Sequence, residues 1–232
     1  MTSSVASSNY SNRASFNPNA DRASISNTNI KDRIVGTFTR QFEFIKSNKT
    51  RVSFIWQSRT GHPYSWVFRG DANGDGYAFN DLLYVPAGPS DPKVAWASAT
   101  ERDAFFAFIQ TNDLWKYQGT HPERNSEVSP WLNTLDIRIS QEVPIWKSVK
   151  TELFVNVLNI GNMIDKSWGQ MEEIPFSYRR AVAGATYNAT ANNGQGQWNY
   201  TFNSGTLDGM PIVANDTPIS RWQVQAGLKI KF

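Results

Sequence analysis

The last twelve residues constrain the fold most, because apolar and polar side chains alternate along them. The apolar positions are Trp222, Val224, Ala226, Leu228, Ile230 and Phe232. The positions between them carry Arg, Gln and Lys, with Gly227 in the middle. Since side chains of a β-strand point alternately to its two faces, this segment is predicted to be a strand with one apolar and one polar face. Its length is close to the ~9–11 residues with which a tilted strand crosses a bilayer.

Composition narrows the class of protein. The chain of 232 residues is 13% aromatic and includes nine Trp, which suits the aromatic girdles of membrane barrels. No stretch of about 18 apolar residues occurs, which excludes a transmembrane helix but leaves transmembrane strands open. The lack of Cys excludes a disulfide framework, and a net charge of +3 is too small to indicate nucleic acid as a partner. The segment after Met1 does not resemble a signal peptide, so an outer-membrane location would require sequence upstream.

Four further segments alternate in the same way, and we expect them to be strands. They are residues 34–44, 51–57, 131–141 and 149–160. Their apolar faces carry Phe38, Phe42 and Phe44; Val52, Phe54 and Trp56; Leu135, Ile137 and Ile139; and Leu153, Val155 and Val157. Arg40 is the exception, because it falls on the apolar face of the first segment. The expected fold is all-β and antiparallel, with about five strands.

The connections between these strands fall into two length classes. Turns near 46–50 and 144–148 are short, whereas 61–130 and 161–218 are long. Outer-membrane barrels have short periplasmic turns and long outer loops, and we expect 1–32 to be an outer loop and 33–232 to be barrel strands and loops. Within the first long loop, Ser98 and Glu101 form a possible capping box that predicts one short helix.

The cost of burying charge fixes which face meets lipid. An Arg at the bilayer midplane costs roughly 2–4 kcal/mol, so the face with Asp136 and Arg138 is predicted to line the lumen. Arg40 fits only if it lies near a membrane rim, where its guanidinium reaches water. Single-chain barrels start at eight strands, so five strands are incomplete as a barrel on their own.

Several segments carry a family resemblance. They are residues 33–36, 70–76, 80–86, 123–125, 130–138, 153–162 and 166–169, together with the terminal strand. Taken together they resemble the carboxyl-terminal part of TonB-dependent receptor barrels, specifically the Oar-like group with a carboxypeptidase-regulatory-like leading domain. The resemblance implies a receptor or transporter of about 22 strands in the bacterial outer membrane.

The resemblance also implies partners. These are outer-membrane lipid, the remainder of the barrel and its plug, TonB through an N-terminal part not present here, and an unidentified ligand. A strand ending in Phe resembles the sorting signal read by the barrel-insertion machinery. The residues expected to form this membrane-assembly signal are Trp222, Val224, Leu228, Ile230 and Phe232.

A second motif predicts a cation site. Oxygen-bearing residues at alternate positions followed by Gly76 match the first half of an EF-hand calcium loop. The candidate ligands are Asp71, Asn73, Asp75, the carbonyl of Tyr77, and Asp81, which stands one position before the usual bidentate acid. The alternative is a turn stabilised by its own Asp and Asn side chains. The sequence leaves both the calcium site and the self-stabilised turn open. If the loop binds Ca²⁺, we expect a structural ion, and we expect no other cofactor.

No catalytic constellation is apparent, so we expect no enzyme. His62 and His121 lie in loops without metal-site spacing, and nothing brings Glu101, Asp103, Glu123 and Glu127 together as a catalytic pair. The aromatic residues Tyr64, Trp66, Phe68 and Trp115 could stack on a sugar or peptide, but we expect them to pack the loops on one another. The main alternative is a soluble, secreted, calcium-stabilised β-sandwich that binds glycans.

Overall fold

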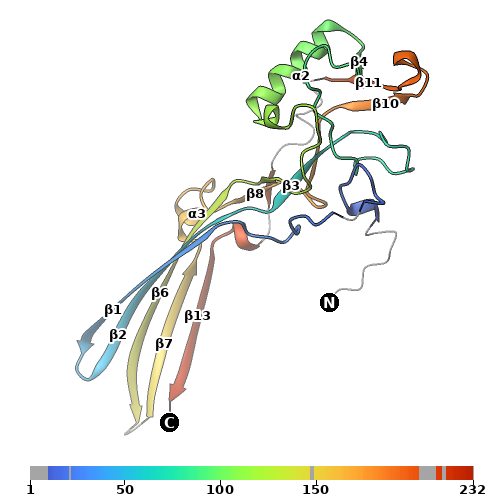
Figure 1. Cartoon of the computed structure of the whole chain (residues 1–232). Helices are drawn as coiled ribbons and strands as arrows, with labels where there is room; N and C mark the ends of the chain where they lie inside the picture. The colour runs from blue at the N-terminus through green and yellow to red at the C-terminus, as the bar shows by residue number, and fades with distance from the viewer. Residues whose placement is uncertain (1–9, 21, 147–148, 204–212, 216–217, 232) are drawn as a thin grey trace. The chain divides into compact units, whose positions relative to one another are not determined.

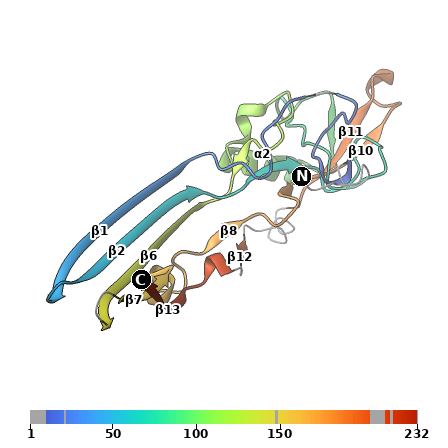
Figure 2. The same ribbon diagram turned by 90° about the horizontal axis from the view of Figure 1, so that it is seen from below.

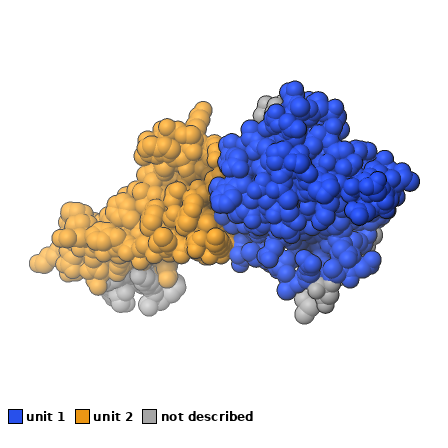
Figure 3. Space-filling view, turned by 45° about the horizontal axis from the view of Figure 1, so that its top comes forward, with its two compact units in different colours: residues 1–29, 62–128, 174–212 blue, residues 30–61, 129–173, 213–232 orange. Residues whose placement is uncertain are grey.

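The computed structural model describes residues 10–20, 22–146, 149–203, 213–215 and 218–231. These residues form mainly β-strands in largely antiparallel sheets with few helices, which confirms the all-β expectation. The chain divides into two compact units, coloured separately in Figure 3. Unit 1 comprises residues 1–29, 62–128 and 174–212, and unit 2 comprises residues 30–61, 129–173 and 213–232.

Unit 2 is built on one five-stranded sheet in the order β1-β2-β6-β7-β13. Figures 1 and 2 show these strands side by side. Their bounds are Arg33–Ile45 for β1, Asn48–Thr60 for β2, Trp131–Trp146 for β6, Val149–Leu158 for β7 and Gln223–Lys231 for β13. Each neighbouring pair is antiparallel. All five predicted strands are therefore present in one sheet.

The ends of these strands differ from the sequence-based expectation. The first turn contains only Lys46 and Ser47, and β6 continues to Trp146 through a register shift after Pro144. Cross-strand pairing continues into these polar stretches, from Ile45 to Asn48 in the first hairpin, so polarity alone did not mark the turn. At the other end β7 stops at Leu158, because the helix α3 (Ile160–Ile164) begins two residues later.

The register brings the five predicted apolar faces together. One row of paired residues crosses the whole sheet as Phe38, Phe54, Ile137, Val157 and Val224. An adjacent row crosses it as Thr39, Ser53, Arg138, Asn156 and Gln225. Because a slip by one residue would exchange the two faces of a strand, this agreement across four pairings is specific. We call the two sides of the sheet the apolar face and the polar face.

Unit 1 contains two small sheets that the sequence did not predict. In one, β3 (Pro63–Val67) lies between β5 (Glu127–Val128) and β9 (Arg179–Ala181). The other has the order β10-β11-β4, with bounds Gly184–Asn188, Gln197–Thr201 and Val94–Trp96. The stretches 61–130 and 161–218 were expected to be long irregular loops. Most of their length instead folds around a hydrophobic core.

Aromatic side chains dominate that core. Trp66, Phe68, Phe105 and Tyr200 are almost completely buried, and the ring of Tyr200 meets the rings of Phe68 and Phe105 edge-on. Edge-to-face aromatic pairs contribute about 0.5–1.5 kcal/mol beyond their burial. The aromatic content of the chain therefore serves the packing of unit 1 as well as the surface of the sheet.

The predicted helix is present as α2 (Ala99–Thr111), and it buries Phe105. The Ser98 hydroxyl accepts a hydrogen bond from the backbone N–H of Glu101 at 3.2 Å, as expected of an N-cap. Glu101 does not complete a capping box, because its carboxylate accepts the backbone N–H of Phe202 at 2.8 Å. The carboxylate thus joins the helix to a segment about 100 residues later in the chain.

The remaining elements are short. A two-stranded sheet pairs β8 (Met171–Glu173) with β12 (Val213–Asn215). Single turns of 3₁₀-helix occur as η1 (Leu114–Tyr117), η2 (Asn192–Gly194) and η4 (Pro218–Ser220). Among the described residues, no helix is both long enough and apolar enough to cross a membrane.

Candidate functional site

The apolar face of the five-stranded sheet is the largest sequence-predicted surface that the structure assembles. Large apolar side chains on all five strands are more than a third exposed, among them Phe38 at 59% and Leu228 at 61%. The exposed members are Ile34, Phe38, Trp56, Ile139, Leu153, Val155, Val224, Leu228 and Ile230. Contiguous exposed apolar patches of this kind mark binding or membrane surfaces rather than ordinary protein exterior.

The polar face is organised by cross-strand hydrogen bonds. Arg138 donates to Asn156 at 3.1 Å, and Asn156 donates to Gln225 at 3.0 Å, which links β6, β7 and β13. On β1 and β2 the hydroxyls of Thr39 and Ser53 lie 3.0 Å apart. Polar groups therefore satisfy one another on this side of the sheet.

On the apolar face two polar pairs lie toward the ends of β2, where the Thr50 hydroxyl donates to Gln141 and the Ser58 hydroxyl donates to Asn133 at 2.6 Å. Between these two pairs, the residues of β2 on the apolar face pair only with apolar residues of β6.

Arg40 is the exception to this separation. It pairs with Val52 on the apolar face, and its guanidinium carbon lies 5.6 Å from the ring centroid of Phe42. A cation over an aromatic ring is partly compensated for the loss of water. Its position near a membrane rim stays a prediction.

The residues of the expected assembly signal lie at the end of the sheet. Val224, Leu228 and Ile230 are between 45% and 61% exposed on β13. Trp222 directly precedes the strand, and its backbone N–H donates to Asn162 at 3.3 Å. Phe232 lies outside the described residues.

The Asp71–Asp81 loop of unit 1 forms a turn held by its own side chains. The Asp71 carboxylate accepts the backbone N–H groups of Gly74, Asp75 and Gly76 at 2.7–3.1 Å. Asn73 in turn accepts the N–H of Asp75 at 2.9 Å. Gly74 and Gly76 have φ values of +78° and +88°, which other residues rarely adopt.

Asp81 lies beneath this turn and is fully buried. Its Oδ2 accepts the N–H of Ala72 at 2.6 Å and of Asn73 at 3.2 Å, whereas its Oδ1 has no partner among the described residues. Burial, with a smaller contribution from the neighbouring Asp75 and Asp71, raises the pKa of Asp81 to about 6 against the opposing effect of its backbone hydrogen bonds. Searched over its described part, the chain holds no group of three acidic or His side chains arranged around one metal position.

Four of the five predicted ligands thus meet around one turn, and most of their oxygens already accept backbone N–H groups. The fifth candidate, Tyr77, is 40% exposed, and its ring contacts that of Tyr10 edge-on at 5.2 Å. The self-stabilised turn accounts for the observed hydrogen bonds. It leaves the buried Oδ1 of Asp81 unexplained.

The other candidates have structural surroundings. Tyr64, Trp66 and Phe68 are buried in the core of unit 1, which confirms their expected packing role, whereas Trp115 is 50% exposed. His62 lies 5.0 Å from Tyr178, ring to ring. The acids are dispersed: Asp103 pairs with Arg102 at 2.9 Å, and Glu127 pairs with Lys116 at 3.1 Å.

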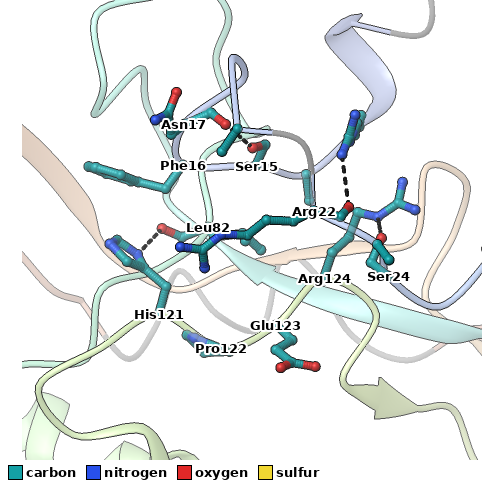
Figure 4. A pocket seen from close by; sticks show the side chains of 14 residues that line it. Ser15, Phe16, Asn17, Arg22, Ser24, Leu82, His121, Pro122, Glu123 and Arg124 are labelled. Atoms are coloured by element: carbon teal, nitrogen blue, oxygen red, sulfur yellow. Dashed lines mark hydrogen bonds between the residues drawn. The ribbon is translucent and has the colours of Figure 1, made fainter.

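Sequence reasoning missed one pocket of unit 1, shown in Figure 4. It brings together Arg13, Arg22 and Arg124 with His121. The Nδ1 of His121 lies 3.1 Å from the carbonyl oxygen of Leu82. Burial lowers the pKa of His121, with Arg22 and Lys93 acting in the same direction against the backbone hydrogen bonds. The segments that contribute the arginines and His121 are about 100 residues apart in the sequence, so no local sequence motif predicts this site.

Comparisons with known protein families, with curated proteins and with solved structures gave no match to this chain.

Proposed function

We propose that the five-stranded sheet is a segment of the wall of an outer-membrane β-barrel, with its apolar face toward lipid hydrocarbon and its polar face toward the lumen. The observation that carries this proposal is the in-register contrast between the two faces across all five strands. Hydrocarbon is a suitable neighbour for Phe38, Ile139 and Leu228, which are about half exposed or more.

Strand length and connectivity support the same assignment. The five strands have 13, 13, 16, 10 and 9 residues, enough to cross a bilayer at a tilt. The turn at Lys46–Ser47 and the short β6–β7 connection join strands at one end of the sheet. The chain segments that enter unit 1 leave from the opposite end. A barrel with short turns on one side and long outer segments on the other has this pattern.

The edges of the sheet suggest a larger assembly. Within the described sheet β1 and β13 each have a neighbour on one side only. Unpaired backbone groups in hydrocarbon cost several kcal/mol each, so we infer that strands from the remainder of a barrel pair with both edges. The chain would then be the carboxyl-terminal part of an Oar-like TonB-dependent receptor or transporter, whose plug and TonB contact belong to its N-terminal part.

In this proposal the two units have different tasks. Unit 2 provides the wall, and unit 1 provides ligand-facing segments outside the membrane. The barrel-insertion machinery would read Trp222, Val224, Leu228, Ile230 and Phe232 as the assembly signal.

Calcium at the Asp71–Asp81 loop is a second part of the proposal, as a structural ion that would stiffen the loop. The unpartnered, buried Oδ1 of Asp81 favours it, because a cation would satisfy this oxygen. Isothermal titration of the full chain with CaCl₂ tests it, with Asp75→Asn as the variant and Asp113→Asn, in an α2–η1 turn, as the matched control. Equal heats of binding from Asp75→Asn and the unmodified chain would contradict a calcium site in this loop.

Single cysteines test the membrane assignment cleanly, because the chain has none of its own. A fluorophore on Cys at positions 224, 226 and 228 should be quenched by nitroxide-labelled lipids in vesicles. Fluorophores at positions 223, 225 and 229, on the other face, should be quenched much less. A period-two pattern is expected from a strand in lipid.

The rival function is a soluble, secreted, calcium-stabilised β-sandwich that binds glycans. A second protein layer would cover the apolar face in that case, and none of the six labels would be quenched by lipid. A monodisperse monomer in buffer without detergent would favour this rival and contradict the barrel proposal.

A further inference from the structure

The pocket of Figure 4 lies wholly within unit 1, between the segment 13–24 and the segments around Leu82 and His121–Arg124. Its cavity volume is about 200 Å³, below that of pockets for drug-sized ligands, so it suits only a small molecule. Six of its lining residues are apolar: Ala14, Phe16, Ala20, Ala23, Leu82 and Pro122.

Contacts between distant segments hold the pocket walls in place. The backbone N–H of Ser15 donates to the carbonyl of Asn80 at 2.8 Å, and Ala14 is buried. Phe16 stacks on the His121 ring at a centroid distance of 4.3 Å. On the opposite side Arg124 donates to the Ser24 hydroxyl at 2.6 Å. The site is therefore formed by fixed walls rather than by a free chain end.

The charge of the lining is unbalanced. Arg13, Arg22 and Arg124 face one acid, Glu123, whose carboxylate points away from the guanidinium of Arg124 in Figure 4. None of the three arginines forms an ion pair with an acid among the described residues, which exclude Asp21. Burial lowers the pKa of Arg124, and the charge of Arg13 lowers it further. Positive charges held together in this way favour the binding of an anion.

Hydrogen-bonding capacity in the pocket suits an oxyanion. Arg22 extends toward His121 in Figure 4, and its guanidinium makes no hydrogen bond with the residues that the structure describes. The hydroxyl groups of Ser15 and Ser24 also line the cavity. Planar guanidinium groups present paired donors that match carboxylate and phosphate oxygens.

We propose that this pocket binds a small organic oxyanion, a carboxylate or phosphate attached to an apolar body. The arginines hold the charged group, and Phe16, Leu82 and Pro122 contact the apolar part. This inference names the ligand chemistry for the unit that the proposed function assigns to ligand contact, so its biological role rests on that function. The binding itself does not depend on the membrane assignment, and the two can fail separately.

Titration calorimetry with the full chain in a non-ionic detergent tests the proposal. The probes are phenyl phosphate and benzoate, with inorganic phosphate and neutral benzyl alcohol for comparison. We expect phenyl phosphate and benzoate to bind, phenyl phosphate to bind more tightly than inorganic phosphate, and benzyl alcohol to give no signal. Raising the salt concentration should weaken binding of both charged probes.

Arg22→Gln is the decisive variant, because the Arg22 side chain makes no hydrogen bond within the described part of the chain that would hold the fold together. It should weaken the binding of phenyl phosphate at least tenfold. The matched control Arg102→Gln changes a partly exposed arginine on α2 that pairs with Asp103, and it should change this affinity less than twofold. Absence of binding by the unmodified chain at 10 mM probe would overturn the proposal. So would equal affinity in Arg22→Gln, or benzyl alcohol binding as tightly as benzoate.

Discussion

Replacing Ala226 by Arg separates a lipid-facing sheet from a water-facing one. Ala226 is exposed on the apolar face of β13 and pairs with Val155. Because Ala is small, the substitution removes almost no packing, and its effect reports the surroundings of the new charge. Gln225→Arg places the same charge one residue away on the polar face and serves as the matched control.

The expected magnitude follows from the geometry of the strand. Nine residues of β13 span about 30 Å, or about 21 Å of depth at a 45° tilt. Ala226 is the fourth of them, so it would lie within about 3 Å of the middle of the strand's depth. Arg there costs roughly 2–4 kcal/mol. The control loses the 3.0 Å hydrogen bond from Asn156, which is worth about 1 kcal/mol.

Flotation of the chain with phospholipid vesicles over a urea series measures this difference. We expect Ala226→Arg to reduce the vesicle-bound to free ratio about 30-fold or more, the equivalent of 2 kcal/mol. Ala226→Leu should bind at least as well as the unmodified chain. If Ala226→Arg and Gln225→Arg behaved alike, within about 0.5 kcal/mol, the apolar face would be an ordinary water-exposed surface and the reasoning would be refuted.

Four further perturbations test the structure. Asp81→Asn should stabilise unit 1 against urea at pH 7, by about 3 kcal/mol at most, but should not stabilise it at pH 4. The reason is that the pKa of the Asp81 carboxyl is raised from 3.8 to about 6, so the free energy of unfolding of the unmodified chain falls as the pH rises through that range. An effect of the substitution that did not depend on pH would contradict this prediction. Trp66→Ala should cost about 3–5 kcal/mol in unfolding free energy, against about 0.5 kcal/mol or less for the exposed Trp115→Ala. Ser98→Ala should lower the same unfolding free energy by about 1 kcal/mol, and no change would argue against the observed N-cap. Gly227→Ala should lower the free energy of unfolding in urea by about 1–3 kcal/mol, because the added Cβ would lie 2.5 Å from Cζ of Phe154. An unchanged urea midpoint would show that the Phe154 ring can move aside without cost.

The strands of unit 2 were readable from the sequence because a period of two is a local signal. Each of the five segments showed its own apolar face, and the register then needed only to align them. The ends of the strands were not readable, since Asn48–Thr50 look like a turn but pair across β1 and β6. Polar residues at the end of a strand are equally compatible with a turn and with a continued strand.

Unit 1 could not be anticipated, because its core joins residues far apart in the chain. Phe105 meets Phe202 at 5.4 Å between ring centroids, and the hydroxyl of Tyr200 donates to the carbonyl of Tyr84. No periodicity marks such residues as partners. The same holds for Arg22 and Arg124, whereas the Asp71–Asp75 motif was visible because its hydrogen bonds are local.

Gly227 shows how the polar face fixes the register of the terminal strand. It pairs with Phe154, whose ring lies over the glycine and beneath the guanidinium of Arg138, 4.3 Å from the ring centroid. A register shift of two residues would keep every face assignment of β13 yet place Gln225 or Lys229 where the ring now lies. Alternation excludes only odd shifts, so the aromatic ring between Arg138 and a residue without a side chain excludes the even ones. The glycine that interrupts the alternating pattern in the sequence is therefore part of what specifies the sheet.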